Sequence, residues 1–132
     1  MRYEAHFLIL SLALLSRSSA YAHHSFAAEY DTDKPVQVTG TVTKVEWTNP
    51  HVHFYVGVKN NQGEVVNWNI ELGPPLILRH LGWRQDSLKT GDQVTVEGYL
   101  AKDQSNLANA KKVTLADGRS VFAGSSAEKR AE

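Results

Sequence analysis

The stretch HVHFYVGVKNNQGEVVNWNIEL, residues 51–72, decides the fold of this chain, because apolar and polar residues alternate on both sides of a turn. Strict alternation of this kind predicts a half-buried β-strand. Asn61-Gln62-Gly63 has the length and the glycine of a three-residue hairpin loop. We therefore predict strands at 51–59 and 64–72, joined as a β-hairpin.

The apolar residues of these two strands determine their register. A three-residue loop places four apolar pairs on one face, namely Val58 with Val66, Val56 with Trp68, Phe54 with Ile70 and Val52 with Leu72. The same register places His53 opposite Glu71 and Tyr55 opposite Asn69. A shift by one residue would move every side chain to the other face, so the pattern selects this register.

The segments on either side predict the rest of the domain. A β pattern runs from Val36 to Trp47 and changes phase near Gly40, which indicates a bulge or a strong bend. After the hairpin, Gly73-Pro74-Pro75 begins a short helix that ends at Gly82. Its predicted buried stripe consists of Leu76, Ile77, Leu78 and Leu81. Further strands are predicted at 93–100, where Val94, Val96 and Leu100 face inward, and at 109–115 and 120–122.

The predicted order is three strands, a helix and two strands, followed by a short additional strand. This order is typical of the OB-fold, a small five- to six-stranded Greek-key β-barrel with a helix after the third strand. An open β-sandwich is the alternative, and the position of the helix favours the barrel. We expect an N-terminal arm at 23–35, the barrel at 36–123 and a frayed, disordered tail at 124–132.

The composition restricts the function. The 132 residues contain 14 Lys and Arg against 14 Asp and Glu, and no Cys. The charge balance argues against nucleic acid as a partner, because nucleic-acid-binding domains usually carry an excess of basic residues. The missing cysteines exclude disulfides and thiolate metal sites. We assign no catalytic residues and expect a carrier or sensor, because no substrate groove is readable from the sequence; redox catalysis is the alternative that stays open.

The first 22 residues have the layout of a secretory signal peptide. Arg2 precedes the apolar run FLILSLALL, and the segment ends in Ala20-Tyr21-Ala22. The run is shorter than the roughly 20 apolar residues that span a bilayer, and no second such run follows. We predict cleavage after Ala22, a periplasmic or secreted protein, and no membrane span in the mature chain.

Several motifs resemble those of a family of small exported bacterial proteins of unknown function. They are His-His-Ser-Phe at 23–26, Trp-Thr-Asn-Pro-His at 47–51, Glu-Leu-Gly at 71–73, Ser-Asn-Leu-Ala at 105–108 and Asp-Gly-Arg at 117–119. The resemblance spans nearly the whole mature chain. It implies export and an OB-like fold, without an established activity.

Four histidines suggest a metal site. Cleavage after Ala22 would make His23 the first residue, and its amine and Nδ1 would chelate one ion in the arrangement called a histidine brace. His51 and His53 lie on one strand face, and Glu71 opposite His53 would support them. Such nitrogen ligands favour copper among the divalent metals. The predicted ligand set is His23, His51 and His53, with His24 and Glu71 in support, provided that Phe26 and Tyr30 dock the arm on the barrel.

Two readings without metal remain. A face formed by Tyr55, Asn67, Asn69 and Trp47 is suited to a glycan, a peptide or a partner protein in the cell envelope, since aromatic side chains stack on such ligands. In this reading His53 and Glu71 form only a cross-strand pair. A structural component of the envelope is the third alternative.

Overall fold

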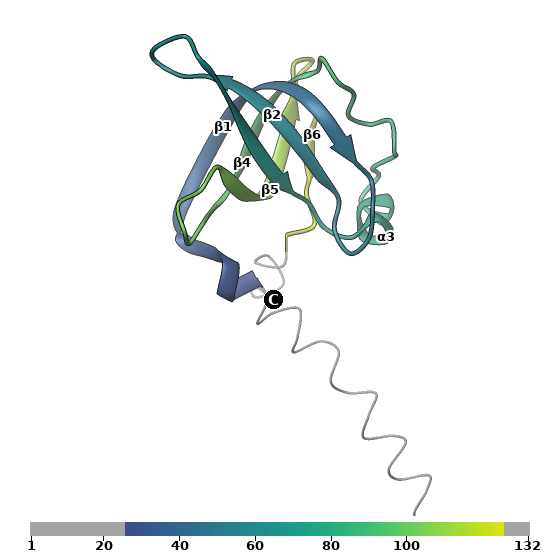
Figure 1. The fold of residues 1–132 in the computed structure, drawn as a ribbon. Helices are drawn as coiled ribbons and strands as arrows, with labels where there is room; N and C mark the ends of the chain where they lie inside the picture. Colours follow the sequence, from purple (N-terminus) through teal and green to yellow (C-terminus); the bar gives the residue numbers. More distant parts are fainter. Residues whose placement is uncertain (1–25, 126–132) are drawn as a thin grey trace, which may run out of the picture.

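Six strands and a short helix follow one another along the chain in a computed structural model that describes residues 26–125. The elements are β1 (Tyr30–Glu46), β2 (His53–Lys59), β3 (Val65–Glu71), α3 (Pro75–His80), β4 (Gln93–Ala101), β5 (Leu107–Leu115) and β6 (Ser120–Phe122), as Figure 1 shows. The predicted order of strands and helix is therefore confirmed. Among the described residues, no helix is long and apolar enough to cross a membrane.

The sheet closes on itself to form a barrel. Its strands lie in the order β3-β2-β1-β4-β5-β6, and an additional pairing joins β3 to β5. This closing pair is parallel and covers three residue pairs, from Asn69 with Leu107 to Glu71 with Asn109. The protein is thus a small OB-like β-barrel, as the sequence predicts, and not an open sandwich.

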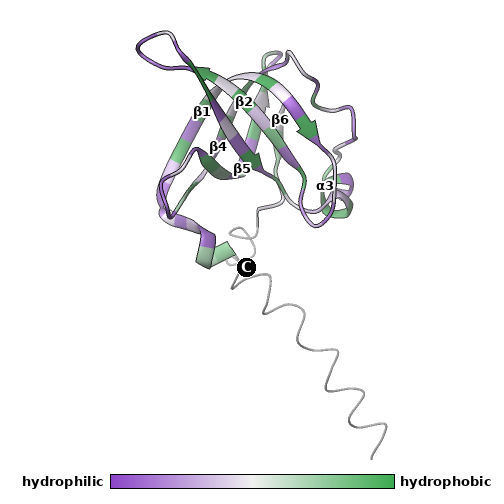
Figure 2. Ribbon diagram, in the orientation of Figure 1, coloured by the Kyte–Doolittle hydropathy of each residue, from purple (hydrophilic) through white to green (hydrophobic). Residues whose placement is uncertain are grey.

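The hairpin has the predicted register. Val58 pairs with Val66, Val56 with Trp68, Phe54 with Ile70, His53 with Glu71 and Tyr55 with Asn69. Beyond the strands, the Leu72 amide donates to the Val52 carbonyl at 2.8 Å. Gly63 in the loop has a φ of +80°, the left-handed conformation that glycine adopts without strain. Hydrophobic and hydrophilic residues alternate along the strands in Figure 2.

Strand β1 begins six residues earlier than predicted. Tyr30 already pairs with Ala101 of β4, and its side chain is 2% exposed, so residues 30–35 belong to the sheet and not to an arm. The sequence gives little sign of this, because most residues of that stretch are polar and exposed. At the other end, Ser125 is buried, so residues 124 and 125 pack on the barrel instead of fraying. Residues 126–132 of the predicted tail lie outside the described part.

The irregularity of β1 lies at Thr43 and not at Gly40. The register with β2 shifts between Val42 and Lys44. Gly40 has another role, because a Cβ atom at this position would lie 2.3 Å from the carbonyl oxygen of Gly57. Here β1 leaves its pairing with β4 and begins its pairing with β2, so the two backbones approach too closely for a side chain.

The helix buries less than predicted. Leu78 is fully buried and Ile77 is half-buried, but Leu76 and Leu81 are 60% and 44% exposed. The reason is length: a helix of six residues presents one narrow face, and here Pro75 and Leu78, three positions apart, occupy it. Strand β4 also departs from prediction, because a register shift after Glu97 leaves Leu100 half-buried and buries Ala101.

We predict that Gly40→Ala destabilises the barrel by about 1–3 kcal/mol, because the new methyl group would force the β1 and β2 backbones apart. Urea unfolding followed by far-UV circular dichroism measures this. Gly57→Ala is the matched control, since its Cβ would lie closest to methyl groups of the Val65 and Thr43 side chains, at 3.1 and 3.4 Å, and 3.8 Å from the nearest backbone oxygen. Equal stability of the two variants would contradict the explanation.

Candidate functional site

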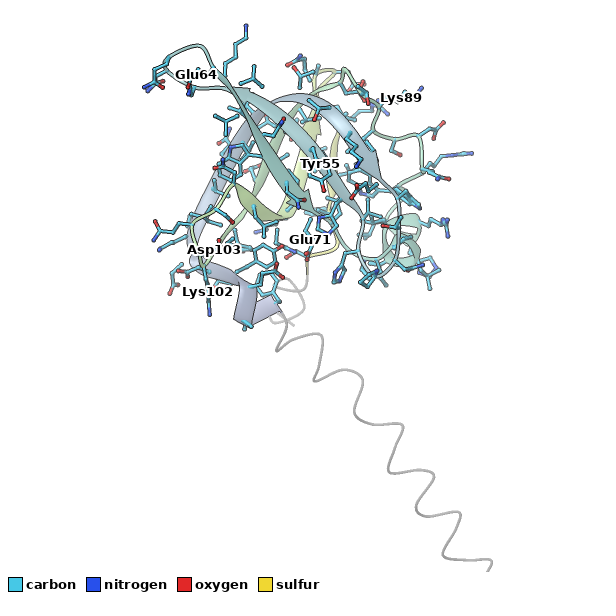
Figure 3. The ribbon with its side chains drawn as sticks, in the orientation of Figure 1. Tyr55, Glu64, Glu71, Lys89, Lys102 and Asp103 are labelled. Atoms are coloured by element: carbon cyan, nitrogen blue, oxygen red, sulfur yellow. The ribbon has the colours of Figure 1, made fainter. Side chains whose placement is uncertain are left out.

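Two histidines lie on either side of one carboxylate at an end of the barrel. His51 Nδ1 lies 3.8 Å from Glu71 Oε1, and His53 Nε2 lies 3.8 Å from Glu71 Oε2. The side chains of His51, His53 and Glu71 are 35%, 26% and 13% exposed. In Figure 3, Glu71 lies at the same end as Lys102 and Asp103, while Glu64 lies at the opposite end. The cluster is therefore open to solvent on its histidine side.

Both oxygens of Glu71 accept hydrogen bonds from buried partners. The Tyr30 hydroxyl donates to Oε2 at 2.9 Å, and the Asn109 side-chain amide donates to Oε1 at 3.1 Å. Asn109 in turn accepts a 2.7 Å bond from the Ser125 hydroxyl. Donors from β1 and β5 thus hold a carboxylate of β3. A half-buried charge needs such donors, because its burial without them costs several kcal/mol.

The hydrogen bond of His53 selects the tautomer of its neutral ring. Its Nδ1 lies 2.8 Å from Asn69 Oδ1, an atom that only accepts. The proton of the neutral ring therefore resides on Nδ1, and Nε2 presents its lone pair on the side of Glu71. Lone pairs beside a carboxylate attract a cation, either a proton or a metal ion.

The chain just after the N-terminal histidines docks at this same end. Residues 26–29 form one helical turn, and the Phe26 ring packs against Tyr30 and Tyr99 with centroid distances of 5.4 and 6.2 Å. The Lys102 amide donates to the Glu29 carbonyl at 2.8 Å, and the Lys102 ammonium donates to the Ala27 carbonyl. Figure 1 shows this turn beneath the barrel. Phe26 thus packs against Tyr99 of β4, and Tyr30 is itself the first residue of β1. Whether the N-terminal histidines reach β2 stays a prediction, because they lie outside the described residues.

Glu29 belongs to the same electrostatic environment. Partial burial and the negative charge of Glu71 raise the pKa of Glu29, and Asp103 adds to this effect. His53 and His51 act in the opposite direction and lower it. The shift shows that the docked turn, the β4–β5 loop and the cluster are close enough to interact through charge.

The predicted metal ligands are only partly described. The structure brings His51, His53 and Glu71 together, whereas His23 and His24 lie outside the described residues. Within residues 26–125 no group of three or more His, Asp or Glu side chains is arranged to hold a metal ion. Glu71 directs its two oxygens to Tyr30 and Asn109, so these three residues alone do not form a closed set of ligands.

The four residues of the predicted ligand-binding face differ in their exposure and in their contacts. Tyr55 is half-buried, its hydroxyl donates to Glu46 at 3.4 Å, and the Lys44 ammonium lies 5.6 Å from its ring centre. Asn67 is exposed, while Asn69 is engaged by His53. Trp47 packs against the core, and its buried indole N–H has no acceptor in the described part of the chain.

Sequence reasoning did not select Asn109, Ser125 or Glu29 for the site, and it assigned Tyr30 only a docking role. Asn109 occurs in a β pattern like any polar strand residue, and its partner Glu71 is 38 positions away. The closing β3–β5 pair brings them together. The sequence signal was that Asn109 lies between two small apolar residues, Ala108 and Ala110. Both alanines are fully buried in the structure.

Fold and site together define a small OB-like barrel with a histidine–carboxylate cluster at one end. Residues 11–110 match a family described as a family of unknown function (DUF6152), and the chain belongs to this family. No curated protein matches the chain. Among solved structures, it is similar to the mitochondrial single-stranded DNA binding protein Rim1 from S. cerevisiae, with 14% sequence identity and a TM-score of 0.49 over 63% of this chain and 93% of that one.

We expect Asn109→Ala to destabilise the protein by about 1–3 kcal/mol, because it removes a buried donor to the Glu71 carboxylate. Thermal and urea unfolding at pH 7 measure the loss. Asn67→Ala is the matched control: Asn67 is exposed, and its replacement should change stability by less than about 0.5 kcal/mol. A loss no larger for Asn109→Ala than for the control would show that the bond contributes nothing.

Glu29→Gln should stabilise the protein slightly at pH 7. The pKa of Glu29 is higher in the folded protein than in the unfolded chain, which means that folding disfavours the ionised carboxylate. The free energy of unfolding of the wild type therefore falls as the pH rises from the unfolded-state pKa through the folded-state pKa. The gain should be below about 1 kcal/mol, because Glu29 is exposed and solvent screens its charge. It should vanish below the ordinary glutamate pKa of about 4.3. Unfolding curves at pH 3 and pH 7 test this, with Glu64→Gln on the distant hairpin as control; a gain that persists at pH 3 would contradict it.

Proposed function

We propose that this protein is an exported OB-like barrel that binds copper, or another divalent metal, as a carrier or sensor. The ligands are His51, His53 and the N-terminal His23, with His24 and Glu71 in support. One observation carries the proposal: two imidazoles flank a fixed carboxylate at the end of the barrel where the N-terminal segment docks. Export rests on the leader pattern of residues 1–22.

The chain is long enough to bring His23 to the cluster. His23 precedes Phe26 by three residues, and an extended chain spans at most about 3.6 Å per residue, so its Cα lies within about 11 Å of that of Phe26. Phe26 packs on Tyr30, whose hydroxyl reaches Glu71. The docking of this turn beside Tyr30 supports the proposal that an N-terminal ligand completes the site.

The donor set suits copper. Two imidazoles, a third imidazole and an amine offer the nitrogen ligands that copper prefers in tetragonal geometry. Glu71 balances positive charge beside them without giving up its bonds to Tyr30 and Asn109. Both the amine and the imidazoles must lose protons to bind, and their reference pKa values are about 7.7–8.0 and about 6.5. Affinity should consequently fall as the pH drops from 8 to 5.

A module without metal is the second candidate. Its specific support is one face of β2 and β3, where the half-buried Tyr55 ring lies beside the Lys44 ammonium and Asn67 is exposed. An aromatic ring with neighbouring polar groups is the kind of surface on which a sugar or a peptide stacks. The ligand would be a glycan, a peptide or a protein of the cell envelope.

Copper titration of the protein, purified after export and processing by a bacterial host, tests the first proposal. We predict one Cu(II) per chain and a loss of affinity of at least about tenfold in His53→Ala, because an imidazole ligand is removed. His80→Ala is the matched control, since His80 is exposed near the end of α3. A variant with one extra residue before His23 should bind as weakly as His53→Ala.

Three results decide between the candidates. N-terminal sequencing that finds another first residue would remove the amine ligand. Full affinity with the extra residue would exclude the brace. No binding at pH 8 would leave the module without metal as the explanation, and Tyr55→Ala would then be the variant to test against a panel of glycans.

A further inference from the structure

A buried tyrosine joins the N-terminal segment to the histidine–carboxylate cluster. Tyr30 is the first residue of β1 and is 2% exposed. Its ring packs on Phe26, and its hydroxyl donates to Glu71 Oε2 at 2.9 Å. One side chain therefore contacts both the docked turn and the carboxylate between the two histidines.

The other contacts of the docked turn are with β4 and with the residue that follows it. Phe26 packs on Tyr99 of β4, and the backbone of residues 27–29 accepts hydrogen bonds from Lys102, just after β4. The Tyr30 hydroxyl instead crosses to β3. Tyr30 thus links the turn directly to Glu71, whereas Tyr99 is linked to Glu71 only through its strand partner Asn109.

Two donors fix the Glu71 carboxylate. The Tyr30 hydroxyl donates to Oε2 at 2.9 Å. Asn109 occupies the other oxygen of Glu71. With both oxygens held, the carboxylate keeps one orientation between His51 and His53.

We propose that Tyr30 is a positioning residue that couples docking of the N-terminal segment to metal binding. It does so by fixing the start of β1 and the Glu71 carboxylate against each other. This inference rests on the proposed function, because the bound group is the metal of that site. Coupling is reciprocal: if the docked segment favours the metal, the metal favours the docked segment by the same factor.

The variant Tyr30→Phe tests the coupling, because it keeps the ring against Phe26 and removes only the hydroxyl. Tyr55→Phe is the matched control, since its hydroxyl donates to Glu46 and not to Glu71. Both variants are purified after export and compared with wild type by Cu(II) titration, by electron paramagnetic resonance of the copper complex, and by amide exchange at Lys102 in the absence of metal. The Lys102 amide reports docking, because it donates to the Glu29 carbonyl.

We expect Tyr30→Phe to lower copper affinity about tenfold, to change the resonance spectrum and to speed exchange at Lys102. Tyr55→Phe should leave all three unchanged. The spectrum separates positioning from general weakening, because a merely less stable protein binds copper with the same ligand geometry.

The outcomes separate this inference from the function on which it rests. Copper binding by wild type with equal affinity and spectrum in Tyr30→Phe would overturn the coupling and leave the metal site intact. Unchanged exchange at Lys102 in Tyr30→Phe would overturn the anchoring role, whether or not copper binds. Absence of copper binding by wild type would overturn the proposed function, and with it the coupling to a metal.

Discussion

The parallel pairing of β3 with β5 determines both the closure of the barrel and the position of its polar cluster. It is short, running from Asn69 with Leu107 to Glu71 with Asn109. Without it the sheet would remain open along β3, and Ile70 and Ala108, both fully buried, would face solvent. The last pair of this contact also brings Glu71 next to the asparagine that binds it. The apolar seam and the polar site are therefore formed by neighbouring residues of the same two strands.

A carboxylate at such a position is unfavourable for folding unless its hydrogen bonds are complete. Glu71 has the Tyr30 and Asn109 donors, and the two histidines lie on its exposed side. An apolar residue here would pack without any of these partners, and replacing buried polar networks in this way is often neutral or stabilising. The arrangement is thus better explained by what it binds or orients than by its contribution to stability. This is the physical reason for assigning the site a function.

The sequence predicts those parts of the molecule whose partners are near in the chain. The hairpin register, and with it the facing of His53 and Glu71, follows from the alternation in residues 51–72 because a three-residue loop allows one match. Asn109 could not be assigned to the site in this way, because its contact with Glu71 exists only in the closed barrel. Tyr30 is similar: its strand pairs with Ala101, and the polar residues after it gave no strand pattern. The helix is a further example, because the sequence predicts Leu76 to be buried and the structure leaves it exposed. Which face of the helix is buried depends on where the barrel lies.

The position of β1 has a consequence for the order of folding. Tyr30 is made early in synthesis, but its partners Glu71 and Ala101 come much later in the chain. Contacts between residues so far apart form slowly, because a long loop must close before they bring any gain. The hairpin of β2 and β3 needs no such closure and forms from local contacts. On this argument His53 and Glu71 face each other as soon as the hairpin forms, whereas the Tyr30 and Asn109 bonds that hold Glu71 form only when the distant strands β1 and β5 reach β3.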